Sequence, residues 1–203
     1  MSNTNAPNGF VEFRRLSGGA PTMGQEGTPM KVAYDNSTAI GYGDPVIQLN
    51  TGYIGRAASA TAVAITGIFV GCRYLASSNN QWTFSKYWPG SGNLGTGDVQ
   101  AFVLTDPSQT YIAQAFNTSF SFTDVGANVN IQIGTVSTTT GFSGASVDFS
   151  TLAVTTTIGF RIVGLLSAYY GTSGAVNGTD DTTAYNRVIV KPNYWANKSL
   201  DGI

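Results

Sequence analysis

Short apolar or alternating runs follow one another along most of this chain. Each is rich in β-branched or aromatic residues and is bounded by Gly, Asn, Asp or Pro, which is typical of strands separated by turns. Between the first two runs, Asn50-Thr51-Gly52 is a short glycine-containing connection that indicates a hairpin. The pattern predicts ten strands, at residues 46–49, 53–57, 68–75, 81–87, 99–104, 111–116, 129–133, 152–155, 160–166 and 185–190.

Helix signals are poor throughout, because Leu, Glu and Lys are scarce and no long stretch keeps a 3.6-residue period. At most one short helix is expected. Pro7, Pro21 and Pro29 leave no room for an ordinary helix in the first forty residues. The pattern therefore predicts an all-β protein, an antiparallel β-barrel or β-sandwich with little or no helix. We expect an extended N-terminal arm over residues 1–40 and a single β domain over 41–203. The Ser/Thr/Gly-rich residues 134–150 are interpreted as loops pinned to the core, with a linker as the alternative.

The composition argues against two classes of partner, nucleic acid and membranes. Charged residues make up 10% of the chain, against about 25% in an ordinary globular domain, and the net charge is −1. No strongly basic face is expected, so nucleic acid is not a predicted partner. No apolar run approaches the roughly 18 residues of a membrane span, and no secretion signal opens the chain, so we expect synthesis in the cytoplasm and no membrane partner. The single cysteine, Cys72, lies in an apolar run and is expected to be buried.

Catalytic chemistry has little support in these residues. The chain has no histidine, which excludes Ser-His-Asp and Cys-His catalysis and histidine-based zinc sites. Glu12 and Glu26 are its two glutamates, and most aspartates occupy turn settings. Asp180-Asp181 offers clustered oxygen ligands for calcium, but a plain polar loop is the favoured interpretation since the spaced calcium-loop pattern is missing. We expect a non-enzymatic protein with no cofactor, no metal and no catalytic residue.

Two groups of residues are candidates for contacts with other molecules. Arg14 and Arg15 form the only adjacent basic pair, suited either to solvent or to bidentate contacts with a partner's carboxylates. A second group of aromatic residues crowds a short segment that ends in a Pro-Gly turn. Core packing is the ordinary interpretation of these aromatics, whereas exposed rings would bind a protein or stack on a sugar. They are Trp82, Phe84, Tyr87 and Trp88.

Nearly the whole chain carries a series of turn-and-strand motifs in a fixed order. They are NGF at 8–10 leading to RRLSGG at 14–19, IGYGDPV at 40–46, GIFVGCRY at 67–74, YWP at 87–89, AFVLTDP at 101–107, YIAQ at 111–114, DVGAN at 124–128, TGFSG at 140–144 and FRIVGL at 160–165. With this series the chain resembles the decoration, or cement, proteins of tailed-phage heads. The resemblance rests on the order of the motifs, because no single one is specific. A closing strand at 188–193 also fits the family, while 194–197 departs from it.

The resemblance implies a virion protein that binds the outer surface of an assembled capsid. Such a protein cements neighbouring subunits of the major capsid protein against internal DNA pressure, commonly as a homotrimer, and is made in the host cytoplasm. An extended arm could add a strand to a neighbour's sheet. Candidate capsid-binding residues are Phe10, Phe13, Arg14 and Arg15, and candidate oligomer or surface contacts are Trp88, Tyr194 and Trp195.

Three other interpretations compete with capsid decoration. A glycan-binding or fibre-type virion protein would use exposed Trp82 or Trp88 against a sugar face. A carbohydrate-active enzyme lacks a recognisable acid/base pair in this sequence. A major capsid protein would need a long helix, for which the chain has no candidate.

Overall fold

The computed structural model describes residues 2–16, 18, 28–59, 64–95, 97–166 and 179–196. Within this part the protein is all-β, as predicted, and it contains the short 3-10 turns η2 (Ser91–Asn93) and η3 (Phe122–Asp124). The strands are β1 (Val11–Arg15), β2 (Thr28–Val32), β3 (Pro45–Gln48), β4 (Ile54–Arg56), β5 (Gly67–Leu75), β6 (Trp82–Ser85), β7 (Val99–Leu104), β8 (Gln109–Phe116), β9 (Asn128–Gln132), β10 (Ser146–Ala153), β11 (Phe160–Leu165) and β12 (Arg187–Pro192). All ten strands expected from the hydrophobic pattern are present, with shifted ends, and the β3–β4 hairpin turns at the predicted residues.

Five strands close into a barrel in the order β8-β10-β9-β11-β12, because β12 pairs back onto β8. The β8–β10 pair is parallel and the other pairs are antiparallel. β1 adds a sixth strand on β8, where Val11 lies opposite Ile112. Closure leaves the central barrel strands without free edges.

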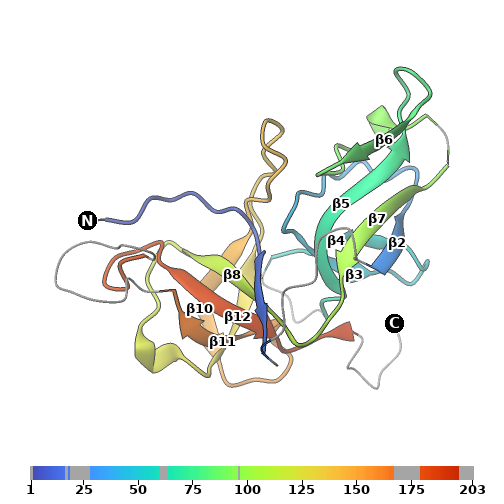
Figure 1. The fold of residues 1–203 in the computed structure, drawn as a ribbon. Helices are drawn as coiled ribbons and strands as arrows, with labels where there is room; N and C mark the ends of the chain where they lie inside the picture. The colour runs from blue at the N-terminus through green and yellow to red at the C-terminus, as the bar shows by residue number, and fades with distance from the viewer. Residues whose placement is uncertain are drawn as a thin grey trace.

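The second sheet has the order β2-β7-β5-β3-β4 and stands beside the barrel (Figure 1). β5 is its longest strand, and two short strands pair with different parts of it. Ile68, near its start, pairs with Pro45 of β3, while Leu75 at its end pairs with Trp82 of β6. β6 therefore forms an edge of this sheet, at the end farthest from the barrel (Figure 1).

Two hydrophobic clusters fill the protein, and β5 contributes to both. Ile68 and Val70 belong to the barrel cluster, whereas Phe69, Cys72 and Tyr74 belong to the cluster of the second sheet. Successive side chains of a strand point to opposite faces, so one strand can serve two cores, and a bulge beside Gly71 adjusts the alternation. The second sheet is thus packed against the barrel over only part of its length.

The first forty residues are built into both sheets, which corrects the boundary expected at residue 40. Residues 2–10 have no regular structure, but β1 joins the barrel and β2 pairs with β7 in the second sheet. The glycines and prolines concealed these strands in the sequence. Pro29 is accommodated because β2 is an edge strand, where a missing N–H does not break a ladder. Residues 1, 17 and 19–27 of the expected arm lie outside the described residues.

Replacement of Phe10 by Ala tests whether the N-terminal segment belongs to the core. The Phe10 ring is fully buried and stacks on Phe160 with the ring centroids 4.5 Å apart. We expect Phe10→Ala to lower the free energy of unfolding by about 3–5 kcal/mol, from lost burial and the cavity left behind. Chemical denaturation measures this, with Phe122→Ala as the control, since Phe122 is 81% exposed. Equal stability of the two variants would contradict this packing.

Candidate functional site

The outer surface of the second sheet carries exposed aromatic and cationic side chains. Trp82 and Phe84 stand two residues apart on β6, so they share one face, and they are 62% and 70% exposed. Phe84 lies opposite Arg73 of β5, which lies opposite Gln100 of β7. Gln100 lies opposite Lys31 of β2, which completes a row across four strands. We call these five residues the aromatic face.

The aromatic face stays exposed because of where β6 lies. On the opposite side of the same strands, Tyr74 of β5 and Val99 and Ala101 of β7 are buried in the cluster of the second sheet. Nearer the barrel, Ile68 and Val70 are covered by the barrel cluster. The end of the sheet that bears β6 projects past this contact (Figure 1). On the face that carries Trp82 and Phe84, the part of the sheet near the barrel is therefore buried and the part at β6 faces solvent.

Local contacts hold the polar members of the aromatic face in place. The Arg73 guanidinium lies 5.4 Å from the centre of the Trp82 ring, and its Nε donates a hydrogen bond to Oε1 of Gln100. Lys31 Nζ lies 3.5 Å from the carboxylate of Asp98, which also accepts a hydrogen bond from the Tyr53 hydroxyl at 3.2 Å. The nearby negative charge of Asp98 raises the pKa of Tyr53. A hollow of about 320 Å³ lies between Trp82, Lys31 and Asp98.

A buried ion pair of the second sheet is tied to the barrel by its hydrogen bonds. The Asp44 side chain is fully buried just before β3, and Arg56 on β4 approaches it with Nε 2.8 Å and Nη2 2.9 Å from its two carboxylate oxygens. Ser143 Oγ and the Gly41 amide donate further hydrogen bonds to the same carboxylate. Burial is the largest influence on the pKa of Asp44 and raises it, while Arg56 and the hydrogen bonds act to lower it. Arg56 also donates to the Gly134 carbonyl in the loop after β9, which ties the second sheet to the barrel.

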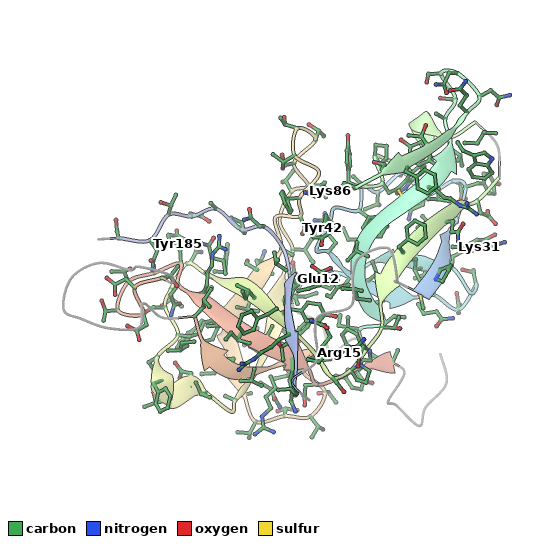
Figure 2. The ribbon with its side chains drawn as sticks, in the orientation of Figure 1. Glu12, Arg15, Lys31, Tyr42, Lys86 and Tyr185 are labelled. Atoms are coloured by element: carbon green, nitrogen blue, oxygen red, sulfur yellow. The ribbon has the colours of Figure 1, made fainter. Side chains whose placement is uncertain are left out.

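Glu12, Tyr42 and Lys86 follow one another where the two sheets meet (Figure 2). The Tyr42 hydroxyl donates to the Glu12 carboxylate at 2.8 Å, and burial together with Glu12 raises the pKa of Tyr42. Lys86 Nζ lies 3.2 Å from the centre of the Phe142 ring, and its partial burial lowers its pKa. The Phe142 ring meets Tyr42 edge to face at 5.7 Å. This group packs β1 and the β6 segment against the loop after β9.

Three predicted contact residues are core residues instead. Phe10 and Trp88 are completely buried, and Trp195 is 1% exposed. The Trp88 indole donates to the Asn36 carbonyl at 3.2 Å, and the Trp195 indole donates to the Thr105 carbonyl at 3.1 Å. With their rings buried and their N–H groups satisfied, these side chains have no surface to offer a partner, so the prediction is wrong for these three.

The other candidates lie at least partly on the surface. Phe13 is half-buried on β1, with the exposed Arg14 guanidinium 5.2 Å from the centre of its ring. Arg15 forms an ion pair with Asp106 at 3.1 Å. Tyr194 is half-buried, and its backbone carbonyl accepts a hydrogen bond from Ile65. These four residues are not brought together with the aromatic face.

The sequence held one signal for the aromatic face, which was not decisive. In Trp82-Thr83-Phe84-Ser85 both aromatics fall on one side of a strand and both hydroxyl residues on the other. This alternation shows that the rings share a face, but not whether that face is inside or outside. Core packing, the ordinary interpretation, holds for Trp88 and is wrong for Trp82 and Phe84.

Several other expectations concern single residues or local clusters. Cys72 is buried and free, as predicted. The Asp180 carboxylate accepts hydrogen bonds from its own loop, from the hydroxyl and amide of Thr182. Among the described residues, no three His, Cys, Asp or Glu side chains gather as a metal site would require. No helix within the described ranges is long and apolar enough to cross a membrane.

Comparisons with known proteins identify no relative. The chain matches no protein-family model, no curated protein and no solved structure. The function must therefore be argued from the residues and the geometry described above.

Breaking the buried ion pair should be costly. We expect Arg56→Met to lower the free energy of unfolding by about 3–5 kcal/mol, because it leaves the Asp44 carboxylate buried without its counter-ion. Asp106→Asn is the matched control, since its pair with Arg15 is partly solvent-exposed and such pairs contribute only about 0–1 kcal/mol. Denaturant titration of both variants measures the difference, and an unchanged midpoint for Arg56→Met would contradict the assigned role.

Cys72 should resist alkylation in the folded protein. Burial raises the pKa of its thiol to about 12, so the reactive thiolate is scarce near pH 8. The residue as a whole is only 1% exposed. We expect iodoacetamide to label the native protein far more slowly than the protein unfolded in guanidinium, as followed by mass spectrometry. Equal labelling rates would show that this part of β5 is open to solvent.

Proposed function

We propose that this protein is a structural component of a tailed-phage virion that binds the outer surface of the assembled head. In this role it cements neighbouring subunits of the major capsid protein and is not an enzyme. The observation that carries the proposal is the aromatic face, which offers two exposed rings and an oriented arginine on a projecting sheet. The ordered series of motifs that resembles the decoration proteins supports the same conclusion.

The residues of the aromatic face suit a protein partner. Trp and Arg are among the residue types that dominate binding energy at protein interfaces, and adjacent exposed aromatics are unusual on a monomer surface without a partner. Burying a Phe or similar apolar side chain contributes about 1.5–3 kcal/mol, before the cost of association. Arg73 is already held by Trp82 and Gln100, so little of its conformational freedom remains to be lost on binding.

The proposed docking surface is the second sheet and not the N-terminal arm. Phe10 is buried and β1 pairs with β8 of the protein's own barrel, so this segment is not a free extended arm. The free edge of β6 and the rings beside it face solvent instead. Arg14 remains exposed on the barrel and could meet carboxylates at the margin of the contact.

Because many copies bind one capsid, a weak contact by each copy is enough to stabilise the capsid. A subunit that touches two neighbouring capsid subunits, or that is joined to its own copies as a homotrimer, gains from effective concentration. The low content of charged residues reduces repulsion between copies placed side by side on a lattice. The proposed location is the outer capsid surface, after synthesis in the host cytoplasm.

Cosedimentation with DNA-filled phage heads tests the proposal. We expect the wild-type protein to saturate at a number of copies set by the capsid lattice, and a Trp82→Ala, Phe84→Ala double variant to bind at least roughly tenfold more weakly. Its stability should change little, because both rings are exposed. Phe122→Ala, which removes an exposed ring from the barrel, is the matched control and should bind as the wild type does.

Two outcomes would contradict the proposal in different ways. Absence of wild-type binding to heads would remove the decoration role and favour a fibre-type or glycan-binding surface protein. Normal head binding by the double variant would keep the role but exclude the aromatic face as the docking surface.

A further inference from the structure

A groove of about 470 Å³ lies on the barrel, outside the aromatic face. One wall is the N-terminal segment at residues 5–8, and the floor is formed by the end of β8 and the adjoining ends of β9 and β10. The loop between β9 and β10 forms the other wall. The volume falls within the range of roughly 300–1,000 Å³ found for small-ligand sites.

Among the residues that the structure describes, no charged side chain lines this groove. Its polar groups are side-chain amides and hydroxyls, and its apolar groups include two phenyl rings. The lining residues include Asn5, Asn8, Gln132, Thr135, Phe116 and Phe142. Amides and hydroxyls donate and accept hydrogen bonds without carrying charge, so they match ligands that are rich in hydroxyl groups and neutral.

The walls are already held by contacts within the protein. The amide of Gln114 donates to the Thr4 carbonyl at 2.8 Å and accepts from the Ala6 amide at 3.0 Å, which holds the N-terminal segment in position. The Phe142 ring is covered by the Lys86 ammonium and by Tyr42. A preformed site loses little conformational entropy when a ligand binds.

Polar groups remain available for a ligand. Within the described part of the chain, the side chains of Asn5, Asn8 and Thr135 make no hydrogen bond to other protein groups. Phe116 is 36% exposed at the end of β8. The groove thus combines unused amide and hydroxyl groups with an accessible ring, the combination that binds the polar edges and apolar faces of a sugar.

Other classes of ligand fit less well. Phosphate or carboxylate groups would find no cation among the described lining residues, and a cationic ligand would find no carboxylate there. An extended peptide binds a sheet through a free strand edge. At this groove the edges are occupied, since Ser146 pairs with Gln132 and Val147 pairs with Ala115.

We propose that this groove binds a neutral saccharide. The proposal does not depend on head binding, because the groove and the aromatic face share no residue. Contact would come from the Asn5, Asn8, Gln132 and Thr135 side chains, with the exposed part of Phe116 against a sugar face.

Saturation-transfer NMR on the full chain tests the groove with three probes: maltotriose, cellotriose and the trimer of N-acetylglucosamine. We expect at least one probe to bind, with an affinity near the millimolar range typical of small open sites. Phe116→Ala and Gln132→Ala should each weaken that binding by roughly three- to tenfold, as measured by titration. Trp82→Ala should leave it unchanged, because Trp82 lies on the other surface. A sulfated trisaccharide should bind no better than the neutral probe.

The remaining outcomes would overturn the proposal. Absence of binding by all three probes at high millimolar concentration would exclude a neutral-saccharide site of useful affinity. Binding that is lost in Trp82→Ala but kept in Phe116→Ala and Gln132→Ala would place sugar recognition on the aromatic face. Circular dichroism of each variant shows that a lost signal does not come from unfolding.

Discussion

The buried pair of Asp44 and Arg56 is the contact on which the relation between the two sheets depends. Its carboxylate accepts hydrogen bonds from Ser143 and Gly41, and its guanidinium reaches the Gly134 carbonyl across the junction. Gly9, at φ +73°, passes so close that a Cβ there would lie 2.7 Å from the Gly43 carbonyl oxygen. A pair this deeply buried is stable only when every partner is in place, which fixes the orientation of the second sheet on the barrel.

That fixed orientation produces both surfaces that could bind a partner. The second sheet meets the barrel through Ile68 and Val70, so its far end, with Trp82 and Phe84, extends into solvent. The loop that carries Ser143 also carries Phe142 and Thr135, so the junction that orients the sheet shapes one wall of the groove. One polar contact therefore supports an aromatic surface suited to proteins and a neutral groove suited to sugars.

The sequence predicted the positions of most strands, but it did not predict which aromatic side chains are buried. Alternation and turn residues located ten strands because both are local properties of the chain. β2 was not predicted because Pro29 argues against a strand unless that strand lies at the edge of a sheet. Which strands lie at an edge is decided by tertiary pairing, which the local sequence does not show. Phe10, Trp88 and Trp195 were expected at contacts but are buried. Aromatic side chains suit cores and interfaces equally, and only the packing of distant residues such as Phe160 and Tyr74 decides between them.

We propose that the aromatic face is the surface that meets the phage head. Hydroxyl-radical footprinting of the protein free and bound to heads measures this directly, since oxidation of each aromatic side chain reports its contact with solvent. We expect Trp82 and Phe84 to lose most of their reactivity on the head, while Phe122 keeps its own. Undiminished oxidation of Trp82 and Phe84 in protein that remains bound to heads would contradict it.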